Sequence, residues 1–515
     1  MRPTMPPMDT RTPTDDDARY LALCARDARF DGRFFTGVTS TGIYCRPVCA
    51  VRAPRRANCR FFDHAAQAER AGFRPCLRCR PELAPLSRAW STQDAGELLV
   101  QHATRLLDDP AQWVGEDGPA MQRLAAKLGV SDRHLRRVFE AHLGVSPLQV
   151  LHTRRLLAAK QLLTDTRLSV GAVAAASGFS SLRRFNAALL ERYGLSPTAM
   201  RRRGVDASGS HAVARGWRPP LDVPALLAFL DARRLPGVDA IDLDQQRYWR
   251  TLRLHTPSGT HTGWFGLRFE PERHRVWLHA SDGLLPALPT LIWRVRALCD
   301  LDADPHAIDA VLGAHFPGGT ALRVPGAIDG FELAVRAVLG QQVTVAAART
   351  LAGRLVARFG EPLETPDPAL NRLFPTPQAL AGASADELGS LGIVRQRQGA
   401  IQALARGVAE GTLDLGPHAD LATTTAALTA LPGIGPWTAQ YIAMRALRWP
   451  DAWPAADVAL HHTLGLSGTP RERERACEAL ARAWQPWRSY AVLRAWAGLY
   501  RPVPVPTPAL EGSPS

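Results

Sequence analysis

Four cysteines near the N-terminus have the side-chain type and the spacing of metal ligands. Three residues separate Cys45 from Cys49, two separate Cys76 from Cys79, and 26 lie between the two pairs. Thiolates in two close pairs are typical of a tetrahedral zinc site, in which the metal keeps sulfur deprotonated at neutral pH. On spacing alone the favoured interpretation is therefore a structural zinc ribbon.

A lone carboxylate near the C-terminus is the second group that could do chemistry. Asp457 follows the segment LPGIGPWTAQY by about 20 residues, and Gly433 and Gly435 of that segment allow a sharp turn and close approach of another chain. The amides of the turn, next to a helix that opens near Trp437, could bind a phosphate. Trp437 and Tyr441 are four residues apart and share one helix face. The pattern predicts a phosphate-binding turn followed by a carboxylate. The alternatives are a simple glycine-rich turn between two core helices and a generic DNA-binding hairpin.

The length and composition indicate several domains around these residues. The 515 residues suffice for three or four cores, and contents of 46% hydrophobic and 21% charged residues are ordinary for globular proteins. No apolar run could cross a membrane and no signal peptide is present, so we expect a cytoplasmic protein with reduced cysteines. We predict a multidomain protein, mainly α with α+β parts, between two unstructured tails. The predicted segments are a cysteine-containing domain (16–88), a helical domain (89–204), a flexible linker (205–218), a small α+β domain (219–322) and an all-α domain (323–502).

Positive charge is concentrated in the N-terminal part of the chain. Of the net charge of +14, residues 1–204 carry +13, with 30 Arg, 2 Lys and 19 acidic residues. This excess predicts a nucleic-acid binder. The segment LAAKLGVS at 124–131 recurs as VAAASGFS at 173–180, and arginine-rich helices are expected to begin at Ser131 and Ser180. The repeat predicts two helix-turn-helix units; a plain helical bundle with solvated arginines is the alternative.

The N-terminal motifs resemble two known families. TGIYCRPVC and AGFRPCLRC are similar to the zinc domain of the Ada family of methylated-DNA repair regulators, in which the first cysteine accepts a methyl group from a methyl phosphotriester. This resemblance implies one zinc ion per chain, with Cys45 as the catalytic acceptor and Cys49, Cys76 and Cys79 as further ligands. The repeat resembles the AraC-type DNA-binding domain, whose two units lie about one turn of DNA apart. The candidate DNA-binding residues in its recognition helices are Arg133, Arg136, Arg137, Arg183 and Arg184, and arginines beside the cysteines that could hold phosphates are Arg46, Arg74, Arg78 and Arg80.

The C-terminal motifs resemble the helix-hairpin-helix DNA glycosylases, in particular 3-methyladenine DNA glycosylase II. The resemblance rests on GQQVT at 340–344, the PGIG turn, Asp457 and PWRSYAVLRAW at 486–496. It implies that a damaged base is extruded from the duplex and that Asp457 stabilises an oxocarbenium-like transition state. Gln341 and Gln342 would contact the duplex, although this family often has leucine at the second position. The residues implied to bind the base are Trp437, Tyr441, Trp496 and Phe229.

Two absences in the sequence restrict the expected chemistry. Bifunctional relatives form a Schiff base with a lysine at the position of Trp437, but no lysine follows Lys160, so we expect a monofunctional enzyme. Only Cys299 and Cys477 lie in the C-terminal half, so no iron–sulfur cluster is expected.

The combined resemblance predicts a DNA alkylation-repair protein. Its glycosylase would hydrolyse the N-glycosidic bond of alkylated purines in duplex DNA, and its N-terminal half would accept methyl groups and regulate transcription. The alternative is primarily a transcription activator with a degenerate glycosylase domain. The expected partners are alkylated DNA, promoter DNA and RNA polymerase, without a membrane, and the expected state is a monomer.

Overall fold

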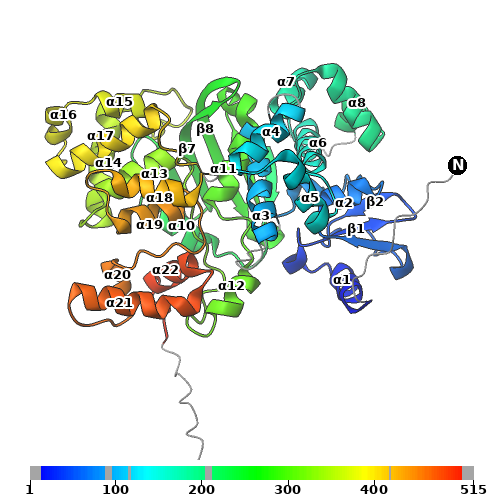
Figure 1. Cartoon of the computed structure of the whole chain (residues 1–515). Coiled ribbons are helices and arrows are strands. Elements are labelled where there is room, and N and C mark those ends of the chain that lie inside the picture. The colour runs from blue at the N-terminus through cyan, green and yellow to red at the C-terminus, as the bar shows by residue number, and fades with distance from the viewer. Residues whose placement is uncertain (1–12, 87–94, 114–116, 203–211, 417–418, 502–515) are drawn as a thin grey trace, which may run out of the picture.

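The computed structural model describes residues 13–86, 95–113, 117–202, 212–416 and 419–501. Helices predominate, and the strands form one four-stranded and one five-stranded sheet. Figure 1 shows the N-terminal half (blue to cyan) on one side of the larger sheet (green) and the C-terminal helices (yellow to red) on its other side. The predicted multidomain, mainly helical organisation is confirmed. Most of the two predicted tails, namely the first twelve residues and those after 501, lies outside the described residues.

The N-terminal domain is built on a small sheet with the strand order β3-β1-β2-β4. Its elements are α1 (Pro13–Ala25), η1 (Ala28–Phe30), β1 (Phe35–Val38), β2 (Ile43–Cys45), η2 (Arg56–Asn58), β3 (Cys59–Phe62), α2 (Ala65–Arg70), β4 (Arg74–Pro75) and η3 (Pro81–Leu83). Strand β1 pairs antiparallel with β2 and β3, whereas β2 pairs in parallel with β4. Two small apolar clusters cover this sheet. A core of this size needs support from a metal or from neighbouring domains.

The second domain is helical and contains the predicted repeat. Its elements are α3 (Ala95–Asp108), η4 (Pro110–Gln112), α4 (Asp117–Lys127), α5 (Asp132–Leu143), α6 (Pro147–Asp165), α7 (Val170–Ala176), α8 (Leu182–Tyr193) and α9 (Pro197–Arg202). The Ser131 hydroxyl caps α5, but α8 is capped by Ser181, one residue later than the predicted Ser180. Gly144 and Gly194 end the two helices in left-handed conformations, as glycine C-caps do.

A five-stranded antiparallel sheet follows, with the order β5-β9-β8-β7-β6. Its elements are β5 (Ala212–Gly216), α10 (Val223–Asp231), β6 (Asp239–Asp242), β7 (Arg247–Thr256), β8 (Gly259–Glu270), η5 (Pro271–Arg273), β9 (Arg275–Ala280), η6 (Asp282–Ala287) and α11 (Leu288–Leu298). The linker predicted at 205–218 is wrong for its second half, because Ala212–Gly216 pairs with β9 and Val213 is fully buried. The rest of that prediction, residues 205–211, lies outside the described residues.

The C-terminal helices form two further cores. They are α12 (Pro305–Leu312), α13 (Gly330–Leu339), α14 (Val345–Phe359), α15 (Pro377–Gly382), α16 (Ala385–Ser390), α17 (Arg395–Ala409), α18 (Leu421–Ala430), α19 (Pro436–Arg445), α20 (Val458–Thr463), α21 (Pro470–Ala481), η7 (Arg482–Trp484) and α22 (Arg488–Trp496). One core joins α13, α14, α17 and α19. The other joins α12 with α20–α22, so α12 packs with the C-terminal helices although the predicted boundary at 322 separates it from them. None of the described helices is both long enough and apolar enough to cross a membrane.

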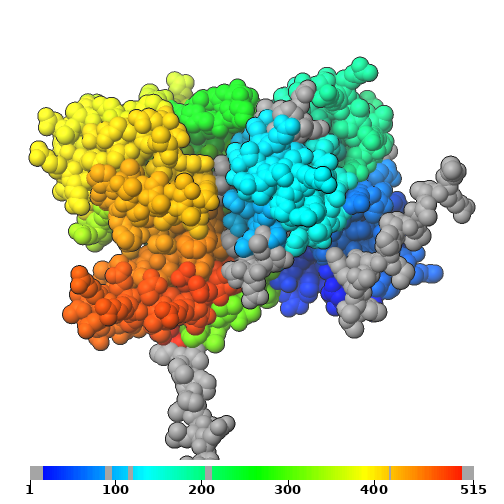
Figure 2. All heavy atoms as spheres, viewed as in Figure 1, coloured from blue at the N-terminus to red at the C-terminus, as the bar shows by residue number. Residues whose placement is uncertain are grey.

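The N-terminal half packs directly against the larger sheet. Phe185 and Leu189 of α8 belong to the same buried cluster as Val213 and Leu278 of the sheet. Figure 2 shows the blue and cyan parts in contact with the green part, without a separating gap. The two halves therefore share a packed interface, whereas a flexible linker would have left them as independent domains.

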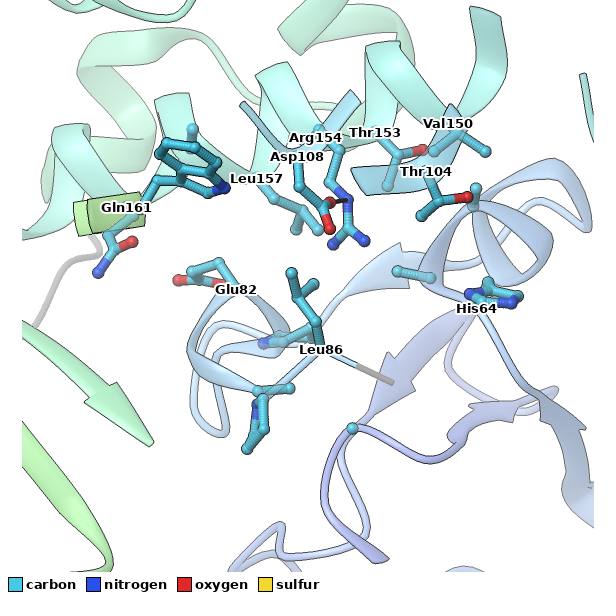
Figure 3. Close-up of a pocket in the computed structure, with 18 of the residues that line it drawn as sticks. His64, Glu82, Leu86, Thr104, Asp108, Val150, Thr153, Arg154, Leu157 and Gln161 are labelled. Carbon is cyan, nitrogen blue, oxygen red and sulfur yellow. Dashed lines mark ion pairs between the residues drawn. The ribbon is translucent and has the colours of Figure 1, made fainter. Parts of the chain in front are cut away.

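Polar contacts reinforce this junction. The buried Arg218 donates hydrogen bonds to Asp302 O and Leu86 O, both at 2.8 Å, and Arg33 forms an ion pair with Asp304. A cavity of about 110 Å³ lies beside these contacts and is lined by residues of all three neighbouring domains. Figure 3 shows its labelled α3 and α6 side chains facing Glu82 and Leu86.

Candidate functional sites

The small sheet brings the four cysteines together. Cys45 ends β2 and Cys76 follows β4, and these two strands are paired, so the two cysteine pairs lie side by side. The four sulfur atoms all lie within 4.8 Å of one another. Zinc–sulfur bonds of about 2.3 Å in a tetrahedron place sulfur atoms about 3.8 Å apart, so this donor set fits a zinc ion. Backbone amides also approach the sulfurs: Arg46 N lies 3.3 Å from Cys79 Sγ.

The cluster cannot hold four thiolates without a cation. Hydrogen bonds among the sulfur atoms raise the pKa of Cys45 and lower that of Cys49 to about 7, with Cys45 as the main partner of Cys49. The same sharing lowers the pKa of Cys76 and raises that of Cys79. A divalent cation removes this competition for protons, because it stabilises every thiolate at once. Cys79 is the most exposed of the four, so assigning the methyl acceptor to Cys45 rests on the family motif rather than on exposure.

The arginines beside the cysteines differ in their availability. Arg46 is buried, pairs with Asp31 and donates to Cys79 O at 3.0 Å. Arg80 pairs with Glu82 and with Asp165 of α6. These two are engaged inside the protein, whereas Arg74 and Arg78 are exposed and better placed to contact a phosphate.

Both recognition helices present their arginines to solvent. Leu135 and Phe139 bury one face of α5, and Phe185 and Leu189 bury the same face of α8. All five predicted DNA-binding arginines are exposed on the opposite faces: Arg133, Arg136, Arg137, Arg183 and Arg184. The arrangement is that of two helix-turn-helix units with free outer surfaces.

The helix-hairpin-helix motif consists of α18, α19 and the glycine-containing hairpin between them. Gly433 has a φ of +81°, which strains any residue other than glycine, and a Cβ there would lie in tight contact with Ala400 Cβ, at 3.1 Å. Gly435 is the N-cap of α19. A Cβ added to it would meet no atom within 4 Å, so the surface beside it is open. No side chain caps α19, so its first amides are available to a phosphate.

The two glutamines before α14 have different environments. Gln341 donates to Gly433 O and to Thr438 Oγ1, both at 2.9 Å, and so holds the loop against the hairpin. Gln342 is exposed and has a φ of +54°, a conformation that only a supported loop maintains. Gln342 is therefore open to solvent, whereas Gln341 is engaged within the protein.

The four residues predicted to bind the base and the predicted catalytic carboxylate line one cavity of about 660 Å³: Phe229, Trp437, Tyr441, Trp496 and Asp457. They come from α10, α19, the N-terminus of α20 and α22. Trp437 and Tyr441 are stacked, with ring centroids 5.4 Å apart and planes at 13°. The ring centroid of Trp496 lies 6.4 Å from that of Tyr441. The cavity has the size and the aromatic lining of a small-molecule or base pocket.

Asp457 is held by donors on both carboxylate oxygens. Trp437 Nε1 donates to Oδ2 at 2.8 Å, and Trp496 Nε1 lies 3.3 Å from Oδ1. Oδ1 also accepts from Leu460 N at 2.9 Å, so the carboxylate caps α20. The side chain is nearly buried, with 8% exposure. These neutral N–H donors thus hold the Asp457 carboxylate in one orientation without neutralising its negative charge.

Two arginines of the pocket were missed by the sequence analysis. Arg445 is buried, donates to the Tyr441 hydroxyl at 2.8 Å and lies 4.8 Å from the Phe229 ring centroid. The Arg233 guanidinium carbon lies 3.7 Å from the same centroid, so the Phe229 ring already makes cation–π contacts with two arginines of the protein. Burial opposes ionisation of Tyr441, but the charges of Arg445 and Arg233 outweigh it and lower its pKa. Arg445 follows Tyr441 by four residues, a helical spacing that could have revealed it.

Four segments of the chain match known families, in the order of the domains described above. They are the metal binding domain of Ada (18–82), a helix-turn-helix domain (124–203), the AlkA N-terminal domain (213–329) and the HhH-GPD superfamily of base excision DNA repair proteins (335–489). The third match begins inside β5, in agreement with the place of this strand in the sheet.

Relatives match each half and also the whole chain. DNA-3-methyladenine glycosylase 2 of Escherichia coli is 35% identical over 54% of this chain and 95% of its own length. The bifunctional transcriptional activator/DNA repair enzyme Ada of Escherichia coli is 36% identical over 32% of this chain and 45% of its own length. A probable bifunctional transcriptional activator/DNA repair enzyme AlkA of Mycobacterium tuberculosis is 40% identical over 95% of this chain and 98% of its own length. Because this last match spans nearly all of both chains, the protein belongs to the family of bifunctional transcriptional activator/DNA repair enzymes in which Ada-type domains are fused to an AlkA-type glycosylase.

Proposed function

We propose that this protein repairs alkylated DNA at two separate sites and regulates transcription in response to DNA methylation. One observation carries the glycosylase function: the Asp457 carboxylate is fixed by two indole N–H groups at the wall of an aromatic cavity. A degenerate glycosylase domain would have no reason to keep this arrangement. The alternative of a transcription activator alone is therefore less well supported.

In the proposed reaction an alkylated purine leaves the duplex and enters the cavity. Ring faces such as that of Trp437 favour a cationic base by cation–π attraction of about 0.5–2 kcal/mol. As the N-glycosidic bond breaks, its electron pair leaves with the base and positive charge develops on the sugar. Asp457 stabilises this charge, and water adds to C1′ and releases a proton.

The product of this reaction is an abasic site with an intact backbone. No lysine follows Lys160, so a lysine Schiff base and the strand cleavage that follows from it are unavailable. The amides at the start of α19 would hold a phosphate of the same strand, and Gln342 would fill the space of the extruded base.

The cysteine cluster would accept methyl groups while it holds one zinc ion per chain. Zinc, when bound, keeps the sulfur atoms ionised and reactive. The Cys45 sulfur would attack the methyl carbon of a methyl phosphotriester, forming an S–C bond while the C–O bond breaks and a phosphodiester anion leaves. The exposed Arg74 and Arg78 would hold neighbouring phosphates.

Transcription regulation would follow from the removed charge. Methylation of Cys45 converts a thiolate into a thioether, so repulsion between this domain and DNA phosphates falls and promoter binding tightens. The recognition helices would supply sequence preference, and RNA polymerase would be the further partner of a monomeric protein. The free thiols of all eight cysteines fit a cytoplasmic location.

Base release from methylated duplex DNA by the purified full-length protein tests the glycosylase function. Chromatography should identify free alkylated purines, and a denaturing gel should show no strand break until abasic sites are cleaved chemically. Absence of free base above the rate in protein-free DNA would overturn the proposal. Borohydride trapping of a protein–DNA adduct would contradict the monofunctional mechanism.

A further inference from the structure

The outward face of the five-stranded sheet carries tryptophans on three adjacent strands. The inward side chains of β7–β9 are buried in the core, whereas Trp249, Trp264 and Trp277 are partly exposed. A solvent-facing sheet surface is normally polar, and tryptophan is a large ring to leave there. The proposed functions use none of these three residues.

Trp249 and Trp277 lie on one partly exposed area of this face, together with His279. Trp249 faces Gly266 across the β7–β8 pair, and a Cβ on Gly266 would lie 2.7 Å from the indole. The Cδ1 and Nε1 atoms of the indole therefore lie over the glycine, where any side chain would displace them. His279 faces Gly266 from β9, and Trp277 faces Arg268, so three rings surround this part of β8.

This area of the sheet is also basic. Arg247 and Arg268 face each other across β7 and β8, and the Arg275 guanidinium lies 4.9 Å from the Trp277 ring centroid. Glu270 forms ion pairs with both Arg268 and Arg275. Together with Arg247 this group has three arginines and one carboxylate, so its net charge is positive. Burial and the charges of Arg268 and Arg247 lower the pKa of His279, so its ring is neutral at neutral pH.

One end of this face is covered by another part of the chain, and the other end is partly exposed to solvent. At one end the connection between α14 and α15 lies on the sheet, where Thr251 donates to Arg372 O and Arg253 pairs with Glu361. At the other end Trp249, Arg268 and Trp277 keep part of their surface exposed. The uncovered end is therefore a basic aromatic surface separate from the base pocket and the recognition helices.

We propose that this surface, formed by Arg247, Trp249, Arg268, Arg275, Trp277 and His279, binds single-stranded DNA. Unpaired bases stack on exposed aromatic rings, and arginines beside those rings contact the phosphates. A duplex offers much less, because its bases are already stacked on one another. The alternating rings and cations match an unpaired strand better than the mixed polar and apolar surface of a protein partner.

The test uses the full-length protein and a fluorescent oligothymidylate of about 12 nucleotides. Trp249→Leu and Trp277→Leu should each weaken binding about tenfold, because stacking on a single ring is lost. Arg247→Gln should weaken it less and should reduce its salt dependence. The matched control Arg471→Gln, an exposed arginine of α21, should leave affinity unchanged.

Further measurements decide between the alternatives. Each tryptophan variant should retain the parent melting temperature, duplex affinity and base-release rate, which excludes misfolding as the cause. Unchanged oligothymidylate affinity in both tryptophan variants would overturn the proposal, as would loss of that affinity in Arg137→Ala of α5. Self-association that disappears in Trp277→Leu, without any oligothymidylate binding, would instead assign the surface to a second copy of the chain.

Discussion

The two reactive centres of this protein hold their anionic groups by opposite means. At the cysteine cluster, four sulfurs within 4.8 Å compete for protons, and only a cation allows all of them to ionise. At the base pocket, one carboxylate is held by indole and backbone N–H groups that come from three different helices. The first site needs a metal to exist as a site. The second is preorganised by hydrogen bonds from neutral groups of the protein and leaves its charge free to act on the substrate.

The largest effect is expected at the acceptor sulfur. Cys45→Ala removes the only proposed nucleophile, so methyl transfer from methylated DNA should be lost completely. Mass spectrometry of the parent should show the added mass of one methylene group on the Cys45 peptide. The same gain on the Cys79 peptide, the most exposed ligand, would reassign the acceptor.

The next largest effect is expected at the carboxylate. Asp457→Asn keeps the shape but removes the charge, so single-turnover base release should fall at least about 100-fold. Duplex affinity, measured by anisotropy, should be retained because Asp457 lies in the pocket rather than on the hairpin. A variant that keeps most of the parent rate would remove Asp457 from the mechanism.

A smaller effect is expected from the donors that hold this carboxylate. Trp437→Phe keeps a ring for stacking but deletes the hydrogen bond to Oδ2, so the rate of base release should fall about tenfold. The loss should lie in the maximal rate rather than in substrate affinity. Trp449→Phe, outside the pocket, serves as control. A change confined to affinity would show that the indole acts by stacking alone.

A modest effect is expected at the junction between the halves. Burial opposes ionisation of Asp304, but the hydrogen bond from Arg33 outweighs it and lowers the pKa of Asp304. The pair therefore stabilises the fold at pH values above the unfolded-state pKa of about 3.9, and this contribution is lost as pH falls. Asp304→Asn keeps the helix cap and should lower the unfolding free energy by up to about 1 kcal/mol at pH 7. Denaturant melts should show the difference vanishing in acid; an equal difference at low pH would exclude the ion pair as its cause.

The smallest effect is expected on base release when zinc is removed. Removal of zinc by a chelator should abolish methyl acceptance and expose the cysteines to thiol reagents. Base release should continue nearly unchanged, because N–H groups rather than a metal hold Asp457. A parallel loss of both activities would show that the folding of the cysteine domain supports the pocket.

The sequence predicted what depends on short spacings. The two cysteine pairs, the hairpin and the Trp437–Tyr441 face all follow from residues close together in the chain. The partners of Asp457 could not be read in this way, because Trp437 and Trp496 approach it from separate helices. Arg233 and Arg445 were missed because an arginine is usually solvated, and here both line a pocket.

The linker at 205–218 was misread for a different reason. Its Ser and Gly content predicts flexibility, yet the short alternation around Val213 is completed as a strand only by pairing with β9. Only the partner strand, 60 residues further on, makes the segment regular. Local composition carries no information on such a partner.

Strand β5 also sets where the protein can be cut. A glycosylase fragment that starts at residue 219 would lose β5, and the backbone groups of β9 that now pair with Ala212–Gly216 would become an open edge. Open edges of this kind recruit strands from other molecules, so such a fragment should aggregate or exchange strands between copies. The segment that enters the second enzyme is thus part of that enzyme's sheet, and any separation of the two activities must cut before residue 212.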